Sequence, residues 1–201
     1  MEIPTHDRLG GRPLDQLFRT ARTCVDWIDR SVADTDIREL YDLLKMGPTS
    51  ANCCPARFVW VRSSEGKELL AGCASGSNRR KILAAPVTVI IGYDLDFSTT
   101  LPKLFPAKAT VMRALFEDAE LARVTAFRNS SLQGAYLILA ARALGLDCAP
   151  MSGFDNSAVD RTFFNATNVK SNFICSIGYG SAQNLSPRNP RLEFEQANHF
   201  A

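Results

Sequence analysis

The stretch PVTVIIGYD (residues 86–94) decides the fold class, because an almost unbroken apolar run follows directly after a proline. Such a run is typical of a β-strand that other elements cover on both faces. FVWVRS (residues 58–63) and FICSIGYG (residues 173–180) have the same character and predict two further strands. Three strands in a chain that is otherwise mainly helical predict a layered α+β domain.

Helical spacing of apolar residues predicts several helices around these strands. They are expected over residues 14–28, 34–46, 65–74, 78–85 and 107–144, and from Ser157 onward. The spacing does not decide whether the last long helix, residues 107–144, is interrupted near residues 127–131. Gly145 is the expected end of this helical segment. The second half of that segment is apolar nearly all round. It should therefore be buried, either in the chain's own core or against a second copy.

The composition is that of a folded domain. The chain has 201 residues, of which 46% are apolar and 22% charged, and its net charge is +2. These values exclude disorder and a basic surface for nucleic acid or membrane. No apolar run approaches the ~18 residues of a membrane-spanning helix, and the first residues hold no secretory signal. We expect one cytoplasmic domain over 1–201, with a loose arm over 1–12 and a C-terminal extension over 185–201.

Cysteine and histidine are poorly placed for chemistry of their own. The six cysteines include no C-x-x-C pair, and the two histidines, His6 and His199, stand at opposite ends of the chain. Zinc sites and Ser-His-Asp or Cys-His centres lack their usual partners, so no metal site is expected. The GYG at residues 178–180 lacks the third glycine and the following helix of a dinucleotide fingerprint. Any redox chemistry should belong to a bound cofactor.

Four polar clusters each adjoin an apolar element, at residues 21–23, 48–52, 78–81 and 187–191. Each cluster alone is compatible with a solvated turn or helix end. Together they offer two arginines for a phosphate, several hydroxyls and amides, and a lysine for a second anionic centre. Flavin mononucleotide (FMN) needs such a set, because its phosphate prefers guanidinium donors and its ring needs positive charge near the N1–C2 edge.

The ordered series LLKMGPTSANCCPARFVWV (43–61), NRRKILAAPVTVII (78–91), LGLDCAPMSGFD (144–155) and IGYGSAQNLSPRNPR (177–191) resembles the nitroreductase superfamily of FMN enzymes. The resemblance covers nearly the whole chain. It implies that family's three-layer α/β/α sandwich with a mixed central sheet. With FRNSS-Q-AYLI (127–138) included, the series is similar to the HadB/RutE subgroup, which is associated with malonic semialdehyde reduction.

The resemblance implies roles for two of the polar clusters. Thr49, Ser50 and Asn52 match the loop that hydrogen-bonds the flavin. Asn78 and Lys81 match a paired asparagine and lysine, in which the lysine reaches the pyrimidine edge of the ring. Lys81 is therefore the expected catalytic residue, because its charge would stabilise the reduced ring.

Other parts of the chain match the family's residues that bind the FMN phosphate and the other side of the ring. Arg188 matches the C-terminal arginine that binds phosphate. Near the N-terminus, Thr23 matches a serine of the family's phosphate pattern. The family has basic residues on either side of that serine, and this chain has Ala21 and Val25 there. Arg22 lies one position away and is, with Thr23, a cofactor-binding candidate. The loop expected over the ring consists of Pro150, Met151, Ser152 and Gly153.

The activity that the resemblance implies is that of an FMN-dependent NAD(P)H oxidoreductase. NADH or NADPH would give a hydride to flavin N5 and leave before the oxidant takes it, in a ping-pong cycle. The subgroup indicates reduction of malonic semialdehyde (3-oxopropanoate) to 3-hydroxypropanoate in pyrimidine degradation. A general nitroaromatic or quinone reductase is the alternative enzyme, and a flavin-binding scaffold without turnover is the non-enzymatic alternative.

The resemblance also implies a homodimer with FMN at the interface. A short semialdehyde acid would need a cation near the ring to bind its carboxylate. Lys108, Arg113 and Arg128 are the candidates in the helical stretch that the family folds over the flavin. Ordinary solvated helix charges are the alternative interpretation for each of them.

Overall fold

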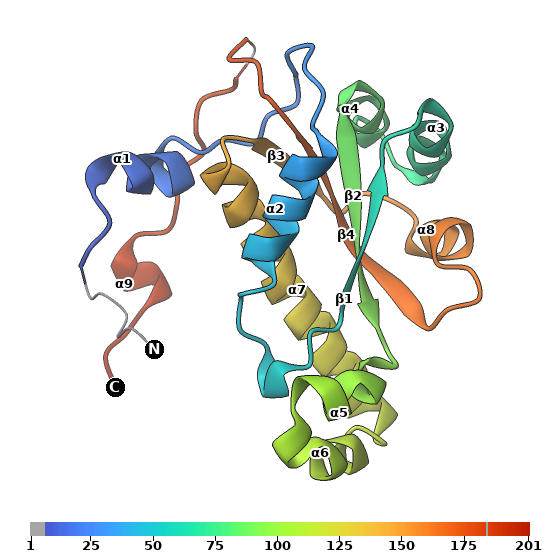
Figure 1. The fold of residues 1–201 in the computed structure, drawn as a ribbon. Helices are drawn as coiled ribbons and strands as arrows, with labels where there is room; N and C mark the ends of the chain where they lie inside the picture. Colours follow the sequence, from blue (N-terminus) through green and yellow to red (C-terminus); the bar gives the residue numbers. More distant parts are fainter. Residues whose placement is uncertain (1–6, 184) are drawn as a thin grey trace.

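A four-stranded sheet forms the centre of the computed structural model, which describes residues 7–183 and 185–201 (Figure 1). In spatial order the strands are β1 (Ala56–Val61), β2 (Val87–Asp94), β4 (Val169–Gly178) and β3 (Asp147–Met151). The strands expected at residues 58–63, 86–94 and 173–180 are β1, β2 and β4. The strand β3 was not expected.

Helices cover both faces of the sheet, as the apolar run in residues 86–94 predicts. On one face lie α2 (Asp34–Leu44) and α7 (Ala119–Ala143), and on the other lie α3 (Ser64–Cys73), α4 (Asn78–Ala84) and α8 (Asn156–Phe163). Val89 and Ile91 pack with α2 and α7, whereas Ile90 packs with the helices of the opposite face. Both faces of β2 are therefore apolar, and the three-layer α/β/α arrangement is confirmed.

The sheet differs from the expected mixed one, because all three of its ladders are antiparallel. Val61, the last residue of β1, pairs with Thr88 near the start of β2. The helices α3 and α4 connect β1 to β2 along the sequence. The chain therefore re-enters the sheet at the same end at which it left. Within the described residues, the one parallel pairing is the isolated bridge between Thr23 and Cys148.

The strand β3 carries sequence features that usually exclude a strand. Pro150 has no backbone N–H to donate, and Asp147 is a poor strand former. However, β3 is an edge strand, and Pro150 is exposed there. The missing donor therefore interrupts no ladder on its outer side.

The helix expected over residues 14–28 is wrong beyond its first turns. A short helix runs through α1 (Gly11–Leu14) to Arg19, so it also begins inside the arm expected over residues 1–12. Beyond it the chain is extended, and Thr23 and Trp27 form bridges to Cys148 and Gly180. Pairing with the sheet edge overrides the helical spacing of the apolar residues. Residues 1–6 of the expected arm, including His6, lie outside the described residues.

The helical segment expected over residues 107–144 is interrupted, but not near residues 127–131. The helix α7 runs unbroken through residues 127–131. The chain instead breaks before Asp118, whose side chain caps α7 by accepting hydrogen bonds from the N–H groups of Glu120 and Leu121, both at 3.0 Å. Gly145 ends the segment in the left-handed conformation, with φ 77°, as expected.

Short helices complete the described chain. They are α5 (Leu101–Leu104) and α6 (Ala109–Leu115), which lie beyond one end of the sheet, and α9 (Phe194–Ala197) in the exposed C-terminal segment (Figure 1). None of the helices in residues 7–183 and 185–201 has the length and apolar character needed to cross a membrane.

Candidate functional site

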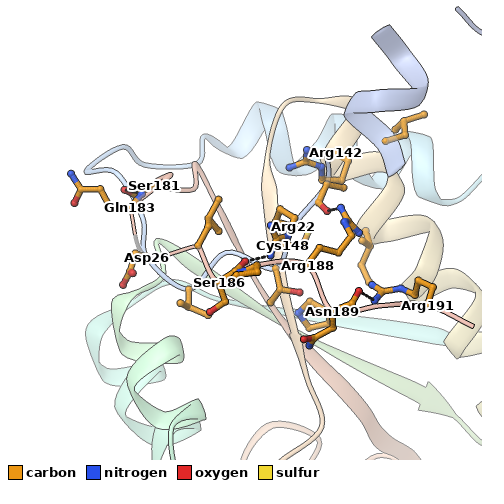
Figure 2. A pocket seen from close by; sticks show the side chains of 18 residues that line it. Arg22, Asp26, Arg142, Cys148, Ser181, Gln183, Ser186, Arg188, Asn189 and Arg191 are labelled. Carbon is orange, nitrogen blue, oxygen red and sulfur yellow. Dashed lines mark hydrogen bonds between the residues drawn. The ribbon is translucent and has the colours of Figure 1, made fainter. Parts of the chain in front are cut away.

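A pocket of about 440 Å³ lies along the edge strand β3, where residues 17–26 and the tail residues 181–191 meet (Figure 2). The pairing of Thr23 with Cys148 brings the N-terminal segment to this edge. The pocket is lined by Arg22, Thr23, Pro150 and Arg188, which are four of the expected cofactor-binding residues.

Arg22 and Arg188 approach this pocket from segments far apart in the sequence. The Arg22 guanidinium donates to the carbonyl of Ser186, and Arg188 donates to the carbonyls of Arg19 and Ala21 at 2.9 and 2.6 Å. In the described part of the chain, neither guanidinium forms an ion pair with a carboxylate. An anion is a stronger acceptor than a carbonyl, so this donor set fits a phosphate. The structure thus brings Arg22 to the phosphate candidate Arg188, despite its shift by one position.

Arg142 lines the same pocket but has a different role. It pairs with Asp147, which also accepts a hydrogen bond from the Gly180 N–H at 3.0 Å. Its guanidinium donates in addition to the Gln16 carbonyl at 3.1 and 3.0 Å. The Arg142 charge is therefore balanced by a structural carboxylate, and it holds the N-terminal helix against α7.

A second group of expected residues surrounds the start of α4. The Lys81 ammonium donates to Asn78 Oδ1 at 3.1 Å, and Asn78 Nδ2 donates to the carbonyl of Gly153 at 3.2 Å. Ser75 donates to the same carbonyl through its N–H and its hydroxyl, at 3.1 and 2.9 Å. These bonds join the paired Asn78 and Lys81 to the loop that follows β3.

The loop after β3 also connects the second group with the pocket. Pro150 lines the pocket, and Gly153 contacts α4 only three residues later. A Cβ atom at Gly153 would lie 2.7 Å from Asn78 Nδ2, so a larger residue would push the loop away. Ser152 is exposed, whereas the Met151 side chain is buried in the core with α3 and α8. Only the backbone of Met151 is therefore able to meet a ligand here.

The third group, Thr49, Ser50 and Asn52, lies at the opposite end of the sheet (Figure 1). This loop leads into Ala56, which pairs with Tyr93 near the end of β2, while α4 leads into the start of β2. The 8 residues of β2 span roughly 25 Å at about 3.3 Å each. Within a single copy of the protein, the loop at residues 49–54 therefore lies far from Lys81.

This loop has an unusual backbone. Ala51, Asn52 and Cys54 have left-handed conformations, with φ of 51°, 51° and 39°. Asn52 Nδ2 donates to the Leu104 carbonyl at 2.9 Å, which places α5 beside the loop. Left-handed conformations of such residues cost of order 1 kcal/mol each and persist only where neighbouring contacts maintain them.

Two residues that contact this loop were missed by the sequence analysis. Asn129 accepts a hydrogen bond from the Ser50 N–H at 2.8 Å, and Gln133 accepts one from the Ala56 N–H at 2.9 Å. The available signal was the FRNSS-Q stretch, where polar residues interrupt an otherwise apolar helix. By itself this stretch indicates an interruption of the helix or the subgroup, because nothing local relates it to the loop at residues 49–54.

The three candidates for a substrate carboxylate occupy different elements. Lys108 directly precedes α6, Arg113 lies on α6, and Arg128 lies on α7. All three are exposed. Arg113 lines a pocket of about 590 Å³ beside α5 and α6. Because α5 contacts the loop at residues 49–54, Lys108 and Arg113 belong to the region next to that loop.

The cysteine side chains are free thiols, and most of them are buried. Burial raises the pKa of Cys24 and Cys53 to about 11, from an ordinary value of 9.0. A hydrogen bond with Cys148, together with burial, also raises the pKa of Cys175. These thiols are therefore neutral and poorly nucleophilic near neutral pH. Among the described residues no group of three or more His, Cys, Asp or Glu side chains is placed to hold a metal ion.

We expect the free energy of unfolding to fall as the pH rises from 9 towards 11, where the unfolded thiols ionise near 9.0 and the folded ones near 11. The contribution of these thiols to the free energy of unfolding is complete below the pKa of the unfolded thiols. It is lost as the pH rises through the pKa of the folded thiols, because between the two values only the unfolded chain releases these protons. Urea unfolding at several pH values checks this. A Cys24→Ala/Cys53→Ala variant should show a shallower decline, and an identical decline would contradict the assignment.

Comparisons with known proteins bear on the family and the fold of this chain. The profile described as the nitroreductase family matches residues 19–180. A Caulobacter sp. (strain K31) protein, provisionally named NADH dehydrogenase/NAD(P)H nitroreductase, is 60% identical over 190 residues, which are 94% of this chain and 97% of the relative. The Ralstonia pickettii protein with the same provisional name and the designation HadB is 54% identical over 187 residues, covering 92% and 95%.

A solved structure shares the fold at much lower sequence identity. It is that of a provisionally assigned nitroreductase from Exiguobacterium sibiricum in complex with FMN. The TM-score is 0.84 at 18% identity, and the match covers 92% of this chain and 96% of that one.

Proposed function

This chain belongs to the nitroreductase family, and from that premise we propose that it is an FMN-dependent NAD(P)H oxidoreductase. The observation that carries the proposal is the pair of guanidiniums, Arg22 and Arg188, which share one pocket without carboxylate partners in the described residues. The loop after β3 connects that pocket with Asn78 and Lys81. Donors for the phosphate and a cation for the ring thus lie at the two ends of one short loop, residues 150–153.

The residues of this chain would divide the work of binding. When bound, FMN supplies hydride transfer between NAD(P)H and the second substrate. Arg22 and Arg188 would neutralise its phosphate, and Thr23 would add a hydroxyl donor. Lys81, held by Asn78, would place positive charge at the pyrimidine edge of the ring. The backbone of residues 150–153 would offer donors along the ring's other side.

A homodimer is part of this proposal. The loop at residues 49–54 lies too far from Lys81 to meet the same flavin within one chain, so a second copy would supply it. The surface of α7 supports such an assembly, because Phe127 and Leu132 are exposed there and line a shallow hollow together with Val124. Large apolar patches that stay exposed on a monomer mark interaction sites.

We expect sedimentation to show a dimer whenever FMN is bound. Without the partner's loop at residues 49–54, the flavin would lack the contacts expected from Thr49, Ser50 and Asn52. Analytical ultracentrifugation with detection at both protein and flavin wavelengths checks this. A monomer that carries a full complement of FMN would contradict the dimeric site.

The finer proposal is that the oxidant is malonic semialdehyde, reduced to 3-hydroxypropanoate in cytoplasmic pyrimidine degradation. The similarity to the HadB/RutE subgroup supports it, as do the exposed cations Lys108 and Arg113 beside the loop. In the described residues neither cation has a carboxylate ion-pair partner. The alternative is a general nitroaromatic or quinone reductase, which needs no such cation.

Steady-state turnover of malonic semialdehyde, a nitrofuran and a neutral quinone by the FMN-loaded enzyme tests the choice. At least one of Lys108→Gln, Arg113→Gln and Arg128→Gln should raise KM for the semialdehyde roughly tenfold, because a charge-assisted contact is lost. KM for the quinone should change little, since only the acid loses an ion pair. Equal effects on both substrates, or no semialdehyde turnover, would favour the general reductase. Protein that stays colourless after incubation with FMN would favour the scaffold over either enzyme.

A further inference from the structure

The inner face of α7 carries an unusual group of buried polar side chains. Thr125, Asn129, Ser130 and Gln133 are 7%, 2%, 0% and 5% exposed. Burying polar groups is unfavourable unless hydrogen bonds compensate for the lost water. This group therefore requires an explanation beyond the stability of the helix.

Asn129 and Gln133 both direct their carbonyl oxygens to one loop. Asn129 Oδ1 accepts from the Ser50 N–H at 2.8 Å, while its Nδ2 donates to the Thr125 carbonyl at 2.8 Å. These two bonds together determine the orientation of the amide. Gln133 Oε1 accepts from the Ala56 N–H at 2.9 Å.

The spacing of the two amides matches the two ends of the loop. Residues four apart on a helix lie on the same face, about 6 Å apart along its axis. Asn129 and Gln133 therefore hold Ser50 and Ala56 a short distance apart, although six peptide bonds separate these residues. Ala51, Asn52 and Cys54, the three left-handed residues, lie between the two anchored ends.

We propose that Asn129 and Gln133 are positioning residues, which preorganise the loop at residues 49–54 for the flavin. This inference rests on the proposed function, because that function makes the loop a flavin-binding element. A loop with free ends would relax from its left-handed conformations, and FMN would then have to order it on binding. The two amides therefore strengthen cofactor binding without touching the cofactor.

The experiment compares Asn129→Leu and Gln133→Met with Ser130→Ala. Ser130 is a matched control, because it is equally buried on the same helix but donates to the Gly92 carbonyl, at 2.9 Å, and not to the loop. Each of the first two variants should raise the FMN dissociation constant roughly tenfold, the effect of a lost hydrogen bond and a disordered loop. Ser130→Ala should leave it within about twofold. Flavin fluorescence titration measures all three.

Amide hydrogen exchange of the flavin-free protein gives a second readout. The Ser50 N–H should exchange faster in Asn129→Leu, and the Ala56 N–H should exchange faster in Gln133→Met. Ser130→Ala should leave both unchanged. If Asn129→Leu does not fold, Gln133→Met alone decides the question.

The outcomes separate the two proposals. Wild-type protein that binds no FMN would overturn both the proposed function and this inference. Wild-type protein that binds FMN, together with loop variants of unchanged affinity, would overturn only the inference. An equal loss of affinity in Ser130→Ala would also overturn it, because the effect would then follow from general destabilisation of α7.

Discussion

Replacing Lys81 with Met is expected to slow the anaerobic bleaching of protein-bound FMN by NAD(P)H about a hundredfold. The Lys81 ammonium is partly buried and held by Asn78 Oδ1 at 3.1 Å, so its charge is fixed before any ligand arrives. A fixed charge lowers the energy of negative charge that develops on the ring, and no reorganisation is needed. Stopped-flow absorbance with saturating nicotinamide substrate measures the rate.

The matched control is Arg80→Met, which removes a cation from the neighbouring, exposed position of α4. It should bleach at nearly the wild-type rate. FMN affinity is measured separately in each variant, because Lys81→Met is also expected to weaken binding. Bleaching of Lys81→Met at the Arg80→Met rate would contradict the catalytic role proposed for Lys81.

The second large effect is expected from the two pocket arginines. Arg188→Ala and Arg22→Ala should each weaken FMN binding at least tenfold, because a charge-assisted contact with phosphate contributes about 1.5–3 kcal/mol. The double variant should lose more affinity than either single variant, but less than the sum of the two losses, because both guanidiniums serve one phosphate and each holds the other's segment. Titration of the flavin-free protein with FMN checks these values.

Two further variants make this prediction specific. Arg188→Lys keeps the charge but not the forked donor, so it should fall between wild type and Arg188→Ala. Arg38→Ala removes an exposed charge on α2, outside this pocket, and should leave the affinity unchanged. If Arg22→Ala also leaves it unchanged, Arg22 acts only by holding the Ser186 carbonyl, and the phosphate depends on Arg188.

The sequence by itself determined the elements whose signals are local. The apolar run at residues 86–94 indicated a strand covered on both faces, and β2 is such a strand. Helical spacing of apolar residues located α2, α3, α4 and α8. The four ordered motifs indicated the family, which the comparisons confirm.

Only the tertiary structure decided how these parts meet, because pairing between distant segments leaves little trace in local periodicity. Pro150 lies in a strand because β3 is an edge strand, and the chain around Thr23 is extended because it pairs with Cys148. Arg22 reaches Arg188 for the same reason. The length of β2 separates Ser50 from Lys81, and the buried amides of α7 become loop anchors only through the packing of α7 beside β1 and β2.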